Sequence, residues 1–506
     1  MENTTARRHA LPGRSRRRAG LAALIGILLL VGAGTGLGFG AGGDRDTSSS
    51  AAAARDPLPF DLPSTERLRS SDRLVFAHYF TPYPLSLDNR PADEDYYARN
   101  YLTADGESGK HAAYGGLLRD RPLPVEPASG DWRSAHYRQE VRTAVAAGID
   151  GFSVDLLSLE GPNWERVQLL MRAAREEDPG FRIMLMPDMK SLDADPATLA
   201  RALAELGAAP NAHRLDDGRL VVSPFKAEEK PAGWWREVLD TLRTRHGVRT
   251  AFVPVFLDLT SHADEFAPLA HGFSTWGSRS HTALGHYSEH AELARRHGKL
   301  WMQPVAVQDA RPNQGVYDEA GNTETLRGSW NHAIEDGADW VQLTTWNDYS
   351  ESTQFAPSLH NGHTYLDVSS YYLARFKTGS WPRVVRDTVY LTHRVQPHDA
   401  RAADQPELMR SRPGSAPARD TVEVLTFLTR PGAVDVTVGD LHERFTMEAG
   451  VRAELLPLRP GRTAAEVTRG GRTTTEAVTR FAVTTSPEVQ DLQYYGVTGG
   501  RPAERP

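Results

Sequence analysis

The chain of 506 residues is longer than one ordinary domain, and its 40% hydrophobic and 24% charged residues can form a large core, which excludes a wholly disordered protein. The net charge is only −7 and much of the basic excess lies at the N-terminus, so we expect no nucleic-acid partner. Because cysteine is absent, disulfides, thiolate metal sites and cysteine nucleophiles are excluded.

The N-terminal segment, residues 1–55, has the pattern of an export signal. An uncharged stretch rich in Leu, Ile, Val, Ala and Gly, residues 19–43, follows Arg14, Arg16, Arg17 and Arg18. A basic segment before an apolar run is typical of a signal peptide or an uncleaved signal anchor. The Ser- and Ala-rich residues 48–54 suit a flexible tether. We therefore expect a secreted protein, or one tethered to the outer face of the membrane by this anchor.

Residues 70–382 show the rhythm of a (β/α)8 TIM barrel. Eight short apolar runs alternate with helix-like segments, which is typical of βα units around a parallel sheet. The predicted strands are residues 74–80, 151–157, 182–189, 220–225, 251–258, 272–276, 300–307 and 340–348, and predicted helices include residues 134–147, 164–177, 196–206, 234–246 and 288–297. No glycine-rich phosphate loop follows the first run, which argues against nucleotide binding. In such a barrel the active site lies at the C-terminal ends of the strands.

In residues 383–500 the sequence pattern changes to short segments in which apolar and polar residues alternate, and turn residues separate these segments. The clearest strand candidates are residues 387–392, 421–428, 433–438 and 480–484. A helix-like piece after Tyr372 leads into this region, and residues 396–420 have the composition of a long loop or linker. The pattern predicts an all-β, sandwich-like accessory domain that supplies no catalytic group.

The eighth run ends in two carboxylates, Asp348 and Glu351, with Trp346 and Tyr349 on either side of the first. Hydrolysis of a glycosidic bond needs a carboxylic acid to protonate the leaving oxygen and a carboxylate to activate water or attack the sugar. The alternative is that Asp348 caps a following helix with Glu351 in its first turn, a role that the same spacing would serve. The position at the end of the last strand favours catalysis, with Glu351 as the general acid and Asp348 as the base.

Polar and aromatic side chains at other strand ends could line the same site. Each alone could be a satisfied core group, but together they suit a sugar-binding cleft. The predicted substrate-binding residues are His78, Tyr79, Asp155, Asp188, Asp258, Trp276, Gln303, Trp346, Asn347, Tyr349 and His363. His360 and His363 are close enough in sequence to suggest a metal site, but no HExxH or paired-histidine helix accompanies them. We expect no metal or other cofactor, a polysaccharide substrate and a monomeric enzyme.

Four motifs occur in order along the barrel, across about residues 73–378. They are residues 77–79 (AHY), residues 148–152 (GIDGF), residues 187–189 (PDM) and, most specifically, residues 346–352 (WNDYSES). With them the chain resembles glycoside hydrolase family 71, the α-1,3-glucanases also called mutanases. The resemblance implies that Asp348 and Glu351 are the catalytic pair and that α-1,3-glucosidic bonds are hydrolysed with inversion. Two departures are Ser350, where fungal members usually have Gly, and residues 273–279, which lack a tryptophan-rich pattern.

Three interpretations of the function remain open from the sequence. The favoured one is an exported, endo-acting α-1,3-glucanase. A related barrel glycosidase could act on α-mannan or another polysaccharide instead. A noncatalytic cell-surface protein that binds polysaccharide could have kept the barrel and lost one carboxylate, but both are present.

Overall fold

A computed structural model describes residues 58–403 and 405–501 of the protein. The predicted export segment and tether, residues 1–55, lie outside the described residues. Within the described ranges, no helix combines the length and the apolar character that a membrane span requires.

The parallel strands form one sheet with the order β5-β4-β3-β2-β1-β11-β8-β7-β6. The two edge strands, β5 and β6, come from one predicted strand and are separated only by Val253 and Pro254. Phe225, just beyond β4, also bridges to Val255. The sheet therefore closes on itself through this broken fifth strand, and the predicted (β/α)8 barrel is confirmed. Its strands are β1 Leu74–Tyr79, β2 Gly151–Leu156, β3 Arg182–Pro187, β4 Leu220–Val222, β5 Thr250–Phe252, β6 Val255–Phe256, β7 Gly272–Thr275, β8 Leu300–Ala306 and β11 Trp340–Thr344.

The barrel strands are buried on both faces, which explains why they read as continuous apolar runs. Alternate side chains point into the barrel or out towards the helices. Phe76, Met184 and Met302 belong to an inner cluster. Their near neighbours Ala77 and Leu185 belong to the larger core that includes the helices. This alternation decides which strand-end residues can reach the mouth of the barrel.

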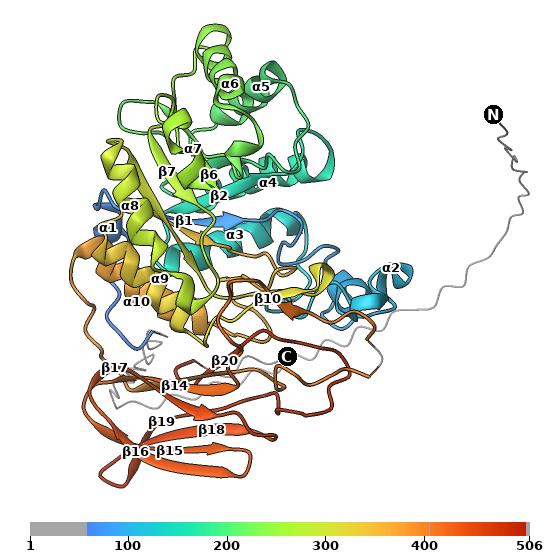
Figure 1. The fold of residues 1–506 in the computed structure, drawn as a ribbon, viewed down its shortest axis with the longest axis vertical. Helices are drawn as coiled ribbons and strands as arrows, with labels where there is room; N and C mark the ends of the chain where they lie inside the picture. The colour runs from blue at the N-terminus through green and yellow to red at the C-terminus, as the bar shows by residue number, and fades with distance from the viewer. Residues whose placement is uncertain (1–57, 404, 502–506) are drawn as a thin grey trace, which may run out of the picture. The chain divides into compact units, whose positions relative to one another are not determined.

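Helices lie around the outside of the sheet (Figure 1). Local signals start several of them: Asp195 accepts hydrogen bonds from the N–H groups of Ala197 and Thr198 at the start of α5. The helix predicted after Tyr372 begins earlier, at Thr364. The α-helices are α1 Thr65–Arg69, α2 Gly106–Gly109, α3 Trp132–Ala146, α4 Gly161–Glu177, α5 Pro196–Gly207, α6 Ala232–Arg245, α7 Leu259–Phe266, α8 His286–Arg296, α9 Glu324–Glu335 and α10 Thr364–Thr378. One π-helix, η1 Tyr97–Tyr101, and the 3-10 helices η2 Ala112–Tyr114, η3 Ala227–Glu229, η4 His281–Ala283 and η5 Pro312–Gln314 lie in the loops.

The C-terminal region contains two four-stranded antiparallel sheets, β17-β14-β12-β20 and β16-β15-β18-β19. Both contribute to one apolar core, with Val389 and Val424 from the first sheet and Val434 and Val467 from the second. The predicted all-β region is therefore present. Its strands are β12 Thr388–His393, β14 Thr421–Leu428, β15 Gly432–Val438, β16 Leu441–Met447, β17 Gly450–Pro457, β18 Thr463–Arg469, β19 Arg472–Val478 and β20 Tyr495–Thr498.

Two details of this region differ from the prediction. Residues 480–484 do not form a strand, because only Val483 makes a bridge, to Gly461. The predicted linker, residues 396–420, contains the short strand β13 Arg410–Ser411. This strand pairs with β10 Val316–Asp318, which in turn pairs with β9 Asp309–Arg311, so a third small sheet forms beside the barrel mouth.

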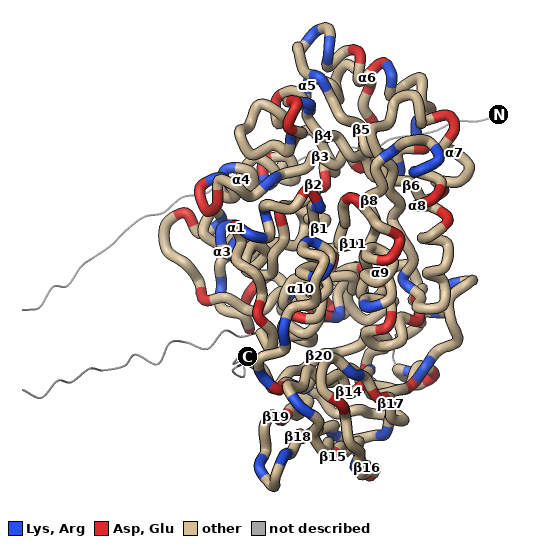
Figure 2. The backbone as a smooth tube through the Cα atoms, turned by 90° about the vertical axis from the view of Figure 1, so that its left-hand side faces the viewer, with Lys and Arg blue, Asp and Glu red and all other residues tan. Residues whose placement is uncertain are grey.

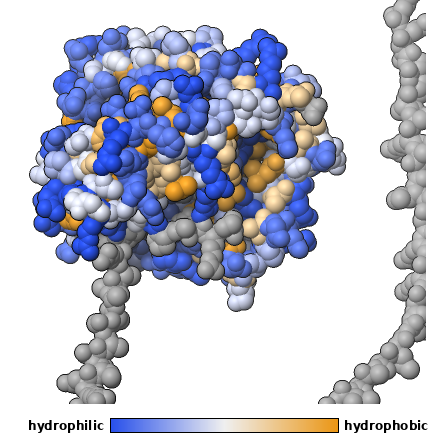
Figure 3. Space-filling model, turned by 90° about the horizontal axis from the view of Figure 1, so that it is seen from below, coloured by the Kyte–Doolittle hydropathy of each residue, from blue (hydrophilic) through white to orange (hydrophobic). Residues whose placement is uncertain are grey.

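The surface carries both signs of charge. Figure 2 shows Lys and Arg interspersed with Asp and Glu along the tube, without a continuous stretch of one sign. Figure 3 shows a face on which hydrophilic residues predominate and apolar residues occur in small groups. The large hydrophobic side chains that are exposed in the described ranges are Leu257, Trp381, Val385, Leu455 and Val478.

Candidate active site

A cleft of about 700 Å³ lies at the C-terminal ends of the barrel strands. Six of the predicted site residues line it together: His78, Asp155, Asp188, Trp276, Asp348 and Glu351. His78 and Asp155 occupy inward-facing positions of β1 and β2. Asp188 lies in the turn after β3, and Trp276 comes directly after β7. Their shared inward register explains why residues far apart in sequence meet at one mouth.

Asp348 lies in a tight turn that follows β11. Its Oδ1 accepts hydrogen bonds from the N–H and the hydroxyl of Ser350, at 3.0 and 2.6 Å, and from the N–H of Glu351 at 3.3 Å. Residues 349–352 form turns and no helix begins there, so the helix-cap alternative is wrong. Burial raises the pKa of Asp348, while the hydrogen bonds of Ser350 and the charge of Arg311 lower it. Ser350 therefore stabilises the ionised form of Asp348.

Glu351 faces a cation that the sequence did not reveal. The Nη1 atom of Arg311 on β9 lies 2.5 Å from its Oε1, and the side chain of Glu351 keeps 17% of its surface exposed. Burial raises the pKa of Glu351 to about 8, the nearby charge of Asp348 adds to that effect, and Arg311 opposes it. Burial and the charge of Asp348 therefore favour the protonated form of Glu351. A carboxyl group in that state can act as a general acid.

Asp155 and His78 form the inner wall of the cleft. The Oδ2 of Asp155 lies 3.7 Å from the Nε2 of His78, and both side chains are 4% exposed. The Oδ1 of Asp155 is buried and has no hydrogen-bond partner among the described residues. Burial, followed by the charges of Asp188, Asp348 and Glu351, raises the pKa of Asp155 well above its ordinary value. Burial also lowers the pKa of His78 to about 3, so the imidazole is neutral at pH 7 and does not favour a charged Asp155.

Trp276 is a partly exposed aromatic residue that lines the cleft. Its ring lies 4.9 Å from His78 and 4.6 Å from Phe225, both in edge-on arrangements. The guanidinium of Arg279 lies 5.7 Å from the ring centre. A ring that is held in place at a cleft is suited to the C–H face of a sugar.

Asp188 also lines the cleft, but local hydrogen bonds occupy its carboxylate. Its Oδ1 accepts from the N–H groups of Lys190 and Ser191, at 2.7 and 3.1 Å, and its Oδ2 accepts from the hydroxyl of Ser191 at 2.9 Å. The charge of Asp188 contributes to the raised pKa of Asp155. Asp188 therefore affects the protonation of Asp155 through its negative charge.

Three predicted binding residues point away from the cleft. Tyr79, Gln303 and Trp346 are at most 1% exposed, and Tyr79 and Trp346 both donate to Glu140 of α3. Gln303 accepts from the indole N–H of Trp301. Tyr79 and Gln303 are one position out of the inward register, so they face the helices. The structure therefore does not bring these three residues to the cleft lining.

Asn347 and Tyr349 lie behind the turn that carries Asp348 and Glu351. The Oδ1 of Asn347 accepts from the N–H of Phe80 at 2.7 Å, and its Nδ2 donates to the carbonyls of Phe80 and Tyr83. Tyr349 is buried in an aromatic cluster with Tyr83 and Tyr97. Both residues hold the turn against the loop after β1, and neither lines the cleft.

The last two predicted binding residues, Asp258 and His363, lie at the starts of helices. Asp258 is exposed and caps α7, where its Oδ1 accepts from the N–H of Ser261. His363 directly precedes α10 and lines two other pockets, of about 390 and 290 Å³. Neither residue belongs to the cleft lining.

Sequence reasoning missed a set of charged residues that line the cleft: Arg279, Asp309, Arg311, Asp318 and Arg412. Asp309 and Arg311 could have been found, because they closely follow the seventh predicted strand. Arg412 lies in the predicted linker, and no local pattern marks it. Four of these five residues lie on, or directly beside, the small β9-β10-β13 sheet.

One group in the described part of the chain has the spacing of metal ligands: His398, Asp399 and Asp420. Asp420 accepts hydrogen bonds from the backbone N–H of His398 at 3.0 Å and contacts its Nδ1 at 2.8 Å. The group does not line the cleft.

Known proteins are similar to this chain over most of its length. The family model described as glycosyl hydrolase family 71 matches residues 127–500, which include the Asp348–Glu351 turn and both C-terminal sheets. A glucan endo-1,3-alpha-glucosidase of Schizosaccharomyces pombe is 25% identical over 386 residues, 71% of this chain and 87% of the relative. A mutanase of Penicillium rubens is 22% identical over 370 residues, 68% of this chain and 80% of the relative. The GH99 endo-alpha-mannosidase structure from Bacteroides thetaiotaomicron matches with a TM-score of 0.48 and 16% identity, over 60% of this chain and 97% of that chain.

Proposed function

Because this chain belongs to glycosyl hydrolase family 71, we propose that it hydrolyses α-1,3-glucan internally, with Asp348 and Glu351 as its catalytic pair. The names of the relatives support this substrate: they are a glucan endo-1,3-alpha-glucosidase, an ascus wall endo-1,3-alpha-glucanase and a mutanase. The observation that carries the catalytic assignment is the turn at the barrel mouth. There the pKa of Glu351 is raised to about 8, while its neighbour Asp348 accepts three hydrogen bonds that favour the carboxylate.

Glu351 is the general acid of this proposal. Its carboxyl O–H gives a proton to the oxygen of the leaving sugar as the C1–O bond breaks. Arg311, 2.5 Å away, then stabilises the carboxylate that remains. A general acid must be protonated before this step, and its carboxylate must be stable after it.

Asp348 is the general base. All three hydrogen bonds that its side chain accepts from the described residues go to Oδ1, so Oδ2 is the oxygen that can take a proton from water. The water oxygen attacks C1 from the face opposite the leaving group, which gives inversion. Because the two carboxyl groups interact, they share their titration, and the bonds from Ser350 favour Asp348 as the one that ionises first.

Trp276 and Asp155 are the proposed sugar-binding residues. Trp276 offers a ring face, and a protonated Asp155 can donate its O–H to a sugar hydroxyl oxygen. A hydroxyl bound there would pair with the buried oxygen of Asp155 that lacks a partner among the described residues, which would offset the cost of burying it.

We also propose that the protein is exported and consists of two domains. The basic and apolar residues 14–43 support export, with or without an N-terminal anchor. Residues 70–382 would form the catalytic domain and residues 383–500 the accessory domain of a monomer.

The test is a screen of the purified protein against insoluble polysaccharides. α-1,3-Glucan, α-1,4-glucan, β-1,3-glucan and α-mannan are incubated separately with wild type and with Glu351→Gln. We expect new reducing ends from α-1,3-glucan alone, in oligosaccharides of mixed length, and none with the variant. Release from α-mannan but not from α-1,3-glucan would overturn the proposed substrate.

A further inference from the structure

The C-terminal region forms one wall of the active-site cleft. Arg412, Pro413 and Gly414 line the cleft, although they lie between β12 and β14 of the accessory sheets. The side chain of Arg412 is 37% exposed. Its Nε donates to Asp318 at 2.8 Å, and its Nη2 lies 3.5 Å from Oδ1 of Asp309.

Asp309 connects Arg412 to the catalytic turn. Its carboxylate is 1% exposed and also accepts from Nε of Arg311, at 2.8 and 2.9 Å. The other end of that guanidinium contacts Glu351. The backbone follows the same route, because the N–H of Ala310 donates to the carbonyl of Glu351 at 2.9 Å. Thus β9 holds both the side chain and the backbone of the turn.

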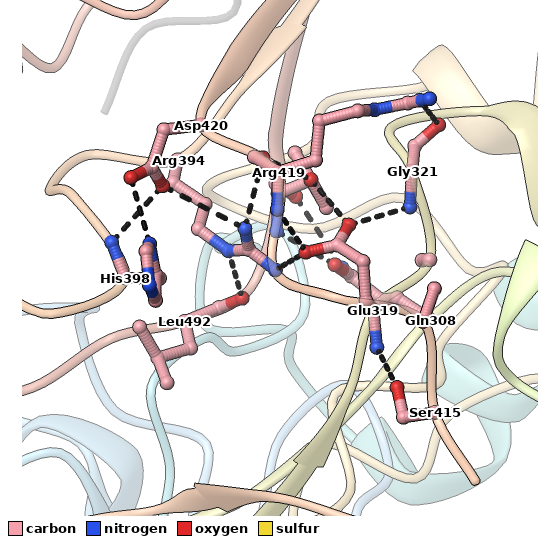
Figure 4. A network of polar contacts seen from close by, with 12 residues as sticks. Gln308, Glu319, Gly321, Arg394, His398, Ser415, Arg419, Asp420 and Leu492 are labelled. Atoms are coloured by element: carbon pink, nitrogen blue, oxygen red, sulfur yellow. Dashed lines mark hydrogen bonds and ion pairs between the residues drawn. The ribbon is translucent and has the colours of Figure 1, made fainter.

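The segment that carries Arg412 is fixed on both sides. β13 pairs with β10, and the N–H of Arg412 donates to the carbonyl of Tyr317 at 2.8 Å. Further along, the hydroxyl of Ser415 accepts from the N–H of Glu319. Figure 4 shows Glu319 within this junction, where its carboxylate meets Arg394. Glu319 and Arg394 are at most 1% exposed and pair at 2.8 Å, so the guanidinium of Arg412 is presented from a well-braced segment.

We propose that Arg412 is a positioning residue of the active site, which holds Asp309 and Arg311 in the arrangement that places Arg311 against Glu351. The inference rests on the proposed role of Glu351 as the general acid. Without Arg412, Arg311 and Asp309 interact more strongly with each other, so less of the positive charge of Arg311 acts on Glu351. This change, together with the loss of a nearby positive charge, favours the protonated form of Glu351.

Other charged groups near Glu351 and Arg412 stay in place in an Arg412 variant. They are Asp348 in the same turn, Asp309 and Arg311 on β9, Arg279 after β7, Asp155 on β2 and Asp318 on β10, together with the phenol of Tyr83. We therefore expect the titration midpoint of Glu351 to shift in an Arg412 variant, while the other charged groups of the site stay in place.

The experiment follows the Glu351 carboxyl group directly. The full chain is labelled with δ-carbon-13 glutamate and titrated by NMR, and the signal that disappears in Glu351→Gln is assigned to Glu351. In Arg412→Met we expect its midpoint about 0.5 pH unit higher than in wild type, the scale of one partly screened charge. Arg410→Met is the matched control, because Arg410 is an exposed arginine two positions earlier and outside the cleft lining. It should leave the midpoint unchanged.

An unchanged midpoint in Arg412→Met, or an equal displacement in Arg410→Met, overturns the inference. If the Met variant loses its cooperative unfolding, Arg412→Gln replaces it with the same expectation. As a second readout, the alkaline limb of the kcat/KM profile should move to higher pH in the Arg412 variant. Inactivity of wild type on α-1,3-glucan would count against the proposed function, whereas the NMR midpoint decides on Arg412 whatever the substrate is.

Discussion

The Nη1 atom of Arg311 lies 2.5 Å from Oε1 of Glu351, at the mouth of the barrel. A cation at this distance favours the carboxylate, yet burial and the charges of Asp348 and Asp309 act in the opposite direction and raise the pKa of Glu351 to about 8. The balance favours the protonated form of Glu351, and Arg311 stabilises the carboxylate once the proton is lost. These are the two states through which a general acid passes in each turnover.

Removing either carboxyl group should stop turnover without unfolding the protein. We expect Asp348→Asn and Glu351→Gln each to lower kcat by at least about a hundredfold, the scale of lost acid–base catalysis. Initial rates on α-1,3-glucan and thermal unfolding curves measure the two effects. Asp258→Asn is the control, because this exposed carboxylate caps α7 outside the cleft and Asn caps equally well. Near-normal activity of a catalytic variant would remove that residue from the pair.

The pH dependence follows from the sign of the Glu351 shift. The acid works in its protonated form, so kcat/KM should fall as pH rises through about 8. The raised pKa also affects stability: the folded state binds the proton more tightly than the unfolded chain, so this contribution is present below pH 4.5 and is lost as pH rises towards 8. Glu351→Gln should therefore gain stability relative to wild type as pH rises over that range. A constant difference in melting temperature would contradict the shift.

The stereochemical outcome distinguishes a base from a nucleophile at Asp348. If Asp348 activates water, the first product from an α-linked glucan carries the β configuration at its new reducing end. Proton NMR of the anomeric region, recorded before mutarotation equilibrates the product, gives the answer. An initial α product would mean retention and a covalent glycosyl-enzyme.

Trp276 should contribute mainly to substrate binding. Its ring is partly exposed in the cleft, so Trp276→Ala removes about 1–2 kcal/mol of apolar contact with a sugar. We expect KM or the half-saturating glucan concentration to rise about tenfold, with a smaller change in kcat. Trp381→Ala is the control, because Trp381 is 46% exposed and lies outside the cleft lining. Equal effects of the two variants would exclude a platform role for Trp276.

The barrel should not fold properly without the accessory sheets. The buried carboxylate of Glu319 pairs with Arg394 at 2.8 Å and accepts from the hydroxyl of Tyr494 at 2.6 Å. A chain that ends at Pro382 lacks both partners, and it also lacks Tyr390, Leu425 and Phe427, which belong to the main hydrophobic core. The apolar side chains that these residues cover would then be exposed to water. We expect that chain to be insoluble or inactive, whereas a chain that lacks residues 1–55 should stay active. Soluble, active protein from the chain without the accessory sheets would refute this dependence.

The sequence by itself determined the barrel and the place of the proposed catalytic pair at its mouth. Each strand of a closed parallel sheet is covered on both faces, so it needs an apolar run, and eight such runs could be counted. Strand ends of a barrel converge, which made Asp348 and Glu351 after the last strand predictable. His78, Asp155 and Trp276 followed from the same rule.

Only the tertiary structure decided which face each residue takes. A strand that is apolar on both faces carries no alternation, so the sequence did not show that His78 points inward and Tyr79 outward. Likewise, Trp346 and Asn347 stand beside Asp348 in the motif but serve the packing behind the cleft.

The charge environment of Glu351 also depended on the tertiary structure. Arg412 meets Asp309 from a segment that is 103 residues away in the chain. A contact of that kind arises from the docking of the accessory sheets on the barrel, and it leaves no period or local motif in either segment. Local sequence patterns indicate which residues of one element are buried. The pKa of an acid, in contrast, depends on every charge that folding brings near it.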